Sequence, residues 1–170
     1  VNGATLSLQD VTTTGTQSYT ASTGITTNTT YTSADSAITF DGDVTIADAT
    51  NGLSVDTGAG AGTITFTGAV DSEAGETNDL TLTAGTGDVD LQGDAGLGTS
   101  GELGAFEIVS AAQVDLGSVE AESIAVSSAT NIDLNGTTYT AATGSLSMAA
   151  PVDLDAGAVT TTLTARTATT

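Results

Sequence analysis

Residues 62–91 read GTITFTGAVDSEAGETNDLTLTAGTGDVDL, and this stretch decides the fold. It contains three short segments in which apolar and polar residues alternate, at Thr63–Phe66, Leu80–Thr83 and Asp88–Leu91. Alternation with a period of two is typical of a β-strand that buries one side. Glycine, asparagine and aspartate lie between the segments and favour tight turns. The stretch therefore predicts short strands joined at corners, without a helix.

The same pattern returns along the chain at a nearly constant spacing. The first apolar column is Ile38, Ile64, Val89, Val114 and Tyr139, at intervals of 26, 25, 25 and 25 residues. Two residues after each of these come Phe40, Phe66, Leu91, Leu116 and Ala141. A period of this size indicates a solenoid, in which each coil is too small to bury its own apolar side chains.

Two further columns share this period. The second column is Leu53, Leu80, Phe106 and Ile132, accompanied by Val55, Leu82, Ile108 and Leu134. The third column is Val44, Val70, Leu97, Ile124 and Ala150. Three columns with one period predict an all-β parallel β-helix with three strands and about 25–27 residues per coil. An antiparallel β-sandwich is the alternative fold, but it does not require the columns to share a period.

Residues 1–35 follow the period least well, so we expect an irregular or capping coil there. Residues 36–170 are expected to form one continuous solenoid domain. The segment YTASTG at 19–24 returns as YTAATG at 139–144, 120 residues later. This longer repeat indicates an excerpt of a longer tandem array.

The charge is large and one-sided. The chain has 170 residues, a formal net charge of -20, and Arg166 as its only basic residue. It therefore cannot neutralise phosphates, which excludes nucleic acid and anionic membrane surfaces as partners. No apolar run reaches 18 residues, so membrane insertion is not expected.

The composition also argues against an enzyme. His, Cys and Lys are absent, which removes Ser–His and Cys–His pairs, Schiff bases and the phosphate-binding lysine of P-loops. A pair of carboxylates could still hydrolyse polysaccharides, as in some β-helical enzymes. Such sites combine carboxylates with basic and aromatic side chains, and the chain has few of either. We expect no catalytic residues and no required cofactor.

Calcium is the ligand that the acidic residues favour most. Asp88 and Asp90 lie on one outward face, as do Asp153 and Asp155. Coil stacking places Asp90 next to Asp115, one period later. Like charges directly opposite each other destabilise a sheet, and a bound divalent cation would relieve them. The competing interpretation is that these carboxylates are solvated and deter unwanted edge pairing.

Several segments resemble a known family. They are VTTTGTQSYT at 11–20, SAITFDGDVTIADATNGLSVDTGAGAGTITFTGAV at 36–70, DLTLTAGTGDVDLQG at 79–93 and IDLNGTTYT at 132–140. They are similar to tandem segments of giant bacterial exoproteins of the filamentous-haemagglutinin type. The resemblance implies a right-handed parallel β-helix that acts as a rigid stalk in surface adhesion or self-association.

From these observations we expect a structural segment of an extracellular adhesin or filament at a bacterial cell surface. Its partners would be neighbouring repeats of the same chain or further copies stacked head to tail. The alternative function is a cation-dependent module that binds glycans or surfaces through an outward face.

Overall fold

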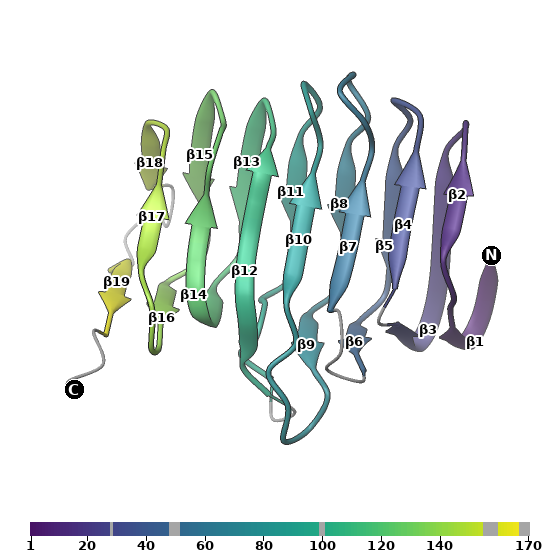
Figure 1. Ribbon diagram of the computed structural model, residues 1–170. Helices are drawn as coiled ribbons and strands as arrows, with labels where there is room; N and C mark the ends of the chain where they lie inside the picture. Colours follow the sequence, from purple (N-terminus) through teal and green to yellow (C-terminus); the bar gives the residue numbers. More distant parts are fainter. Residues whose placement is uncertain (28, 48–51, 99–100, 155–159, 167–170) are drawn as a thin grey trace.

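The structure is a rod of stacked coils. The computed structural model describes residues 1–27, 29–47, 52–98, 101–154 and 160–166. In these residues it contains nineteen β-strands and no helix, and all of its strand pairs are parallel. The first and last strands, β1 and β19, lie at opposite ends of the rod (Figure 1). The expected class, a parallel β-solenoid with three strands per coil, is confirmed.

Each coil has three faces, numbered here as the three sequence columns. The first face consists of the amino-terminal half of β3 (Gln17–Thr27), followed by β5 (Ile38–Asp41), β8 (Ile64–Phe66), β11 (Val89–Leu91), β13 (Gln113–Leu116), β15 (Asn131–Leu134) and β18 (Val152–Leu154). These seven strands pair in succession, so the rod has about seven coils.

The other two faces are built in the same way. The second face consists of β2 (Val11–Thr13), β4 (Thr30–Ser33), β7 (Leu53–Asp56), β10 (Leu80–Thr83), β12 (Leu103–Ser110), the end of β14 (Val119–Val126) and β17 (Leu146–Met148). The third face consists of β1 (Asn2–Ser7), the end of β3, β6 (Val44–Ile46), β9 (Val70–Ser72), the start of β14, β16 (Thr138–Ala141) and β19 (Thr162–Ala165). Ala95 continues the third face between Val70 and Val119 through single bridges.

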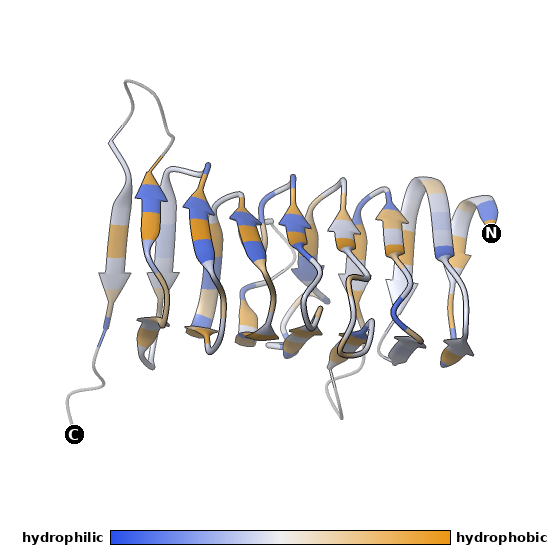
Figure 2. Ribbon diagram, turned by 90° about the horizontal axis from the view of Figure 1, so that it is seen from above, coloured by the Kyte–Doolittle hydropathy of each residue, from blue (hydrophilic) through white to orange (hydrophobic). Residues whose placement is uncertain are grey.

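The coils wind with a right-handed sense. In Figure 1 the front strands β4, β7 and β10 run upward, the strands β5, β8 and β11 behind them run downward, and the chain advances from right to left. This is the hand that the twist of L-residue strands favours for parallel crossovers. Hydrophobic and hydrophilic bands alternate along the strands in Figure 2, as the period of two requires.

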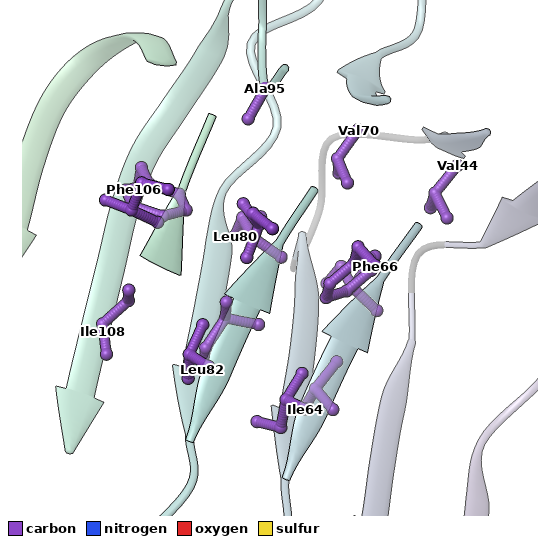
Figure 3. Packing of buried hydrophobic residues seen from close by; sticks show 14 of the residues in the cluster. Val44, Ile64, Phe66, Val70, Leu80, Leu82, Ala95, Phe106 and Ile108 are labelled. Atoms are coloured by element: carbon purple, nitrogen blue, oxygen red, sulfur yellow. The ribbon is translucent and has the colours of Figure 1, made fainter. Parts of the chain in front are cut away.

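The interior is a stack of equivalent apolar side chains. Ile64 pairs with Ile38 on one side and Val89 on the other, and all three are fully buried. Phe40 and Phe66 stack with ring centroids 4.8 Å apart and an interplanar angle of 8°. Figure 3 shows side chains from the three faces directed into the same interior. The core is therefore continuous along the rod.

The corners are tight. Gly85 has a φ of 59°, and a Cβ there would lie 2.4 Å from the carbonyl oxygen of Gly58 in the preceding coil. Only glycine combines this backbone conformation with so close an approach between coils. The turn glycines of the sequence thus set the distance between successive corners.

The column assignments hold up to Leu116 and fail beyond it on the first face. Val114 pairs with Ile132, so the placement of Tyr139 after Val114 is wrong. Tyr139 pairs with Val119 on the third face, together with Ala141. The coil from Val114 to Ile132 spans 18 residues, whereas the coil from Ile38 to Ile64 spans 26.

The second and third columns need the same correction. Phe106 pairs with Ile124, so Ile132 and Leu134 do not belong to the second column. Leu97 is 38% exposed, and Ala95 occupies the place on the third face that was assigned to it. Ile132 is nevertheless fully buried in the core of the first face.

The physical reason is a change at one corner. In the preceding part of the rod, residues 73–79 form a loop between β9 on the third face and β10 on the second. β14 turns this corner directly, with Ala121 on one face and Ile124 on the next. The loss of a loop shortens the coil without changing which side chains point inward, so a fixed period loses register there.

Residues 1–35 contain β1, β2, β3 and β4, which pair in the same sheets as later strands. Their interior is more polar. Tyr19 donates a hydrogen bond to the buried Gln17 side chain at 2.8 Å, and Gln17 Nε2 donates to the Thr32 carbonyl at 2.8 Å. The repeated segments at 19–24 and 139–144 begin on different faces, the first and the third.

The stacked core predicts a strong dependence of stability on inward side chains. Phe66→Ala is expected to lower the free energy of unfolding by about 3–5 kcal/mol, because it removes a buried ring and leaves a cavity. Val109, which is 38% exposed and lies away from the rod ends, provides the control, and Val109→Ala should cost about 1 kcal/mol or less. Urea denaturation followed by circular dichroism measures both. Equal losses in the two variants would contradict a continuous core.

Candidate functional site

A row of four aspartates runs along the outside of the first face. Asp90 pairs with Asp115, Asp115 with Asp133, and Asp133 with Asp153, all in register. They come from β11, β13, β15 and β18, one per coil, and adjacent strands lie about 4.8 Å apart. We call this row the acidic ladder. The expected neighbourhood of Asp90 and Asp115 is confirmed, and the row extends further than the sequence indicated.

Within the described ranges, the side chains that donate hydrogen bonds to the ladder are neutral. Gln92 Nε2 donates to Asp90 at 2.8 Å, and Gln113 Nε2 is 3.4 Å from an Asp115 oxygen. Asp133 Oδ1 is buried and has no hydrogen-bond partner in the part of the chain that the structure describes. The amides reduce the repulsion along the ladder but add no positive charge.

The charged form of Asp115, in the middle of the ladder, is disfavoured by its surroundings. Burial raises the pKa of its carboxyl, and the carboxylates of Asp133, Asp90 and Asp88 raise it further, while the hydrogen bond from Gln113 lowers it. A raised pKa means that the folded protein favours the protonated, neutral form. The ionised form of Asp115 therefore opposes folding at neutral pH.

A second class of aspartates binds the backbone of the next coil. Asp94 Oδ1 accepts a hydrogen bond from the Ser118 amide at 2.9 Å, and Asp79 Oδ1 accepts one from the Ala105 amide at 2.7 Å. We call these residues corner clamps. Among the residues that the structure describes, seven aspartates make such a bond, namely Asp10, Asp35, Asp43, Asp71, Asp79, Asp88 and Asp94.

The clamps explain part of the negative charge as a structural requirement. Their carboxylates satisfy corner amides that would otherwise need water or another acceptor. The clamps were not predicted from the sequence. A signal was present, because Asp43, Asp79 and Asp88 each stand immediately before the first inward residue of a strand.

A third acidic group surrounds Glu102. Burial raises the pKa of its carboxyl, Glu120 and Glu122 raise it further, and Arg166 lowers it. One Glu102 oxygen, Oε1, is buried and lacks a hydrogen-bond partner among the residues described. Arg166 thus relieves this corner group rather than the acidic ladder.

The five residues proposed for calcium do not form one site. Asp90, Asp115 and Asp153 belong to the ladder. Asp88 is instead a corner clamp, which accepts a hydrogen bond from the backbone N–H of Gln113 at 3.1 Å. Asp155 lies outside the described residues. Within the described ranges no group of three or more His, Cys, Asp or Glu side chains is arranged to hold a metal ion. The ladder offers neighbouring pairs of carboxylates instead.

Comparison with known proteins gives no relative for this chain. No protein-family model matches it, and neither a curated protein nor a solved structure does. No helix among the described residues is long and apolar enough to cross a membrane. The functional argument therefore rests on the fold and on the outward surface.

If the ladder is repulsive, removal of one of its charges should stabilise the protein. Asp115→Asn is expected to raise the melting temperature at neutral pH by a few degrees, because it removes a half-buried charge that has a like charge on either side. Glu73→Gln, on an exposed loop, is the control for loss of one charge at a distance and should change it little. Thermal unfolding monitored by circular dichroism gives the comparison. A lower melting temperature for Asp115→Asn would show that the ladder stabilises the fold.

Asp94 tests the clamps. Asp94→Ala should destabilise the protein by about 1 kcal/mol, because the buried corner amide of Ser118 loses its acceptor. Asp94→Asn keeps an acceptor oxygen at the same position and should retain most of that stability. Urea denaturation distinguishes the two variants. Equal stability of Asp94→Ala and the wild type would show that the clamp does not stabilise the fold.

Proposed function

We propose that the protein is a structural segment of an extracellular adhesin or filament, which acts as a rigid stalk or as a unit that stacks on further coils. The observation that carries the proposal is the continuous core, in which equivalent side chains from seven successive strands of the first face lie in register. Such a core resists bending because every coil is held by the same contacts on both sides.

The composition supports a role without catalysis. The chain lacks the side chains that serve most often as nucleophiles or as bases at neutral pH, namely Cys, His and Lys. Two of the three tyrosines are fully buried and the third is 3% exposed, while all three phenylalanines are fully buried in the core. The aromatic rings are therefore used for packing rather than for stacking against sugars.

The carboxy-terminal coil supports stacking. Val152, Leu154 and Leu163 are 38%, 60% and 47% exposed, although their partners Ile132, Leu134 and Tyr139 in the preceding coil are fully buried. The inward side chains of β18 and β19 thus form an apolar surface that a further coil would cover. Either the neighbouring repeat of a longer chain or a second copy meets this requirement.

The resemblance to filamentous-haemagglutinin-type segments supports the same function and a location at the bacterial cell surface. The absence of cysteine is consistent with a secreted protein that folds without disulfides. Partners are expected to be coils of the same kind, because a strongly acidic rod repels nucleic acid and anionic membranes.

Electron microscopy combined with analytical ultracentrifugation tests this proposal. We expect stiff rods of uniform width whose length increases with protein concentration, since growth occurs at the rod ends. Leu154→Asp with Leu163→Asp should shorten them, because charge on the exposed apolar surface opposes stacking. Flexible or globular particles would reject the stalk, and unchanged rod length in the double variant would reject stacking at this end.

A second candidate is a cation-dependent module that binds glycans or surfaces, favoured by the acidic ladder and its lack of cationic partners. In that case calcium bridges neighbouring carboxylates, and we expect it to raise the melting temperature by several degrees more than sodium chloride at equal ionic strength. Asp133→Asn should reduce this increase, and excess chelator should reverse it. A melting curve unchanged by calcium and chelator would reject the cation-dependent module.

A further inference from the structure

The outward row of the first face changes its chemistry half-way along the rod. In the first three coils it consists of Ser18, Thr39 and Thr65, which pair in register. Thr65 pairs with Asp90, and from there the row continues as the acidic ladder to Asp153. The boundary between neutral and acidic positions lies between β8 and β11.

This boundary affects stability locally. In a solenoid each coil interacts mainly with its two neighbours, so stability is a sum of nearest-neighbour contributions. The contacts from β11 to β13, from β13 to β15 and from β15 to β18 each contain a pair of like charges on the outward row. The contacts from β3 to β5 and from β5 to β8 pair hydroxyl side chains there.

The charged surroundings of the ladder do not cancel this repulsion. Asp115 faces Asp90 from β11 and Asp133 from β15, and Asp88 lies beside them. The side chains that donate hydrogen bonds to the ladder are those of Gln92 and Gln113, which are neutral. Arg166 acts on Glu102 instead.

We propose that the acidic ladder is a proton-sensitive device, which loosens the carboxy-terminal coils at neutral pH and tightens them when its carboxylates take up protons. On the first face of the amino-terminal coils, β5 and β8 carry hydroxyl side chains in this row and do not share this response. Neighbouring carboxyl groups that share a proton also replace a repulsion with a hydrogen bond.

The sign follows from the direction of the pKa shift. A carboxyl whose pKa is raised by folding, as at Asp115, contributes stability that is complete below its unfolded pKa and is lost as the pH rises through the folded pKa. The contacts of Asp115 with the coils on either side are therefore more stable in acid than at neutral pH. Asp71, a corner clamp in β9, also has a pKa raised by burial and by the carboxylates of Asp43 and Asp94, while hydrogen bonds from the Gly98 and Gly96 amides lower it. An acid response is thus expected on the third face as well, and the two halves of the rod are compared on the first face, where β5 and β8 pair hydroxyl side chains.

Hydrogen exchange measured by mass spectrometry at about pH 5 and about pH 7.5 tests the device, with rates corrected for the intrinsic pH dependence of amide exchange. We expect protection of β13 and β15 to increase roughly fivefold or more in acid, relative to β5 and β8. An equal response in both halves, or a larger one in β5 and β8, overturns the proposal.

Two variants move the boundary in opposite directions. Asp133→Asn breaks the ladder at its centre and should remove most of the acid response of β13 and β15. Thr65→Asp extends the ladder by one coil and should bring β8 into the responsive region.

If Asp133→Asn does not fold, Asp90→Thr serves the same purpose by restoring the residue type of the preceding coils. A response that ignores all these changes assigns the pH effect to other groups. The result is independent of whether the rod is a stalk.

Discussion

Hydrophobic contact between successive coils is the interaction on which every other feature depends. No coil encloses enough apolar surface to be stable alone, so each inward side chain is buried by its equivalents one coil before and after. The stacked rings of Phe40 and Phe66 and the column through Ile64 and Val89 show this contact most directly. It fixes the strand register, and the register in turn fixes which side chains meet on the outside. The acidic ladder is thus a consequence of core packing, because Asp90 and Asp115 cannot separate while Val89 and Leu91 stay paired with Val114 and Leu116.

The aspartates have two roles with opposite energetic signs. Corner clamps such as Asp79 and Asp94 bind amides of the following coil and use their charge to strengthen those bonds. In the ladder, Asp115 and Asp133 lie side by side on adjacent strands, so their negative charges repel each other. A net charge of -20 therefore does not describe the molecule well unless the two classes are separated. Among the described residues the clamps extend from Asp10 to Asp94 and the ladder from Asp90 to Asp153, so the two classes overlap around β11 and charge has different effects along the rod.

Much of the architecture could be predicted from the sequence, because alternation and a shared period report directly on which side chains face inward. The columns through Ile38 and Leu53 were correct as far as Leu116 and Phe106. The prediction failed at Tyr139 and Ile132, because it assumed a constant number of residues per coil. The corner crossed by β14 is shorter, so the next coil begins earlier in the sequence although the strands still pair coil by coil. Part of the ladder was found through the pairing of Asp90 with Asp115. Asp133 was missed because it belongs to the first short coil, and the clamps were missed because hydrogen bonds to corner amides leave no periodic apolar signal.

The corner between the third and second faces has a practical consequence. The chain crosses it through seven or more residues in the coils around β9 and β10, yet β14 crosses it within a single strand, and the pairing on both sides is undisturbed. Length at this position is therefore decoupled from the register that holds the rod together. Foreign peptides grafted beside Gly75, in the exposed residues 73–75 and away from the buried Asn78 and the clamp Asp79, would project sideways from the shaft at a fixed height. Inserted sequences would therefore be displayed at positions that the stacking of the coils fixes.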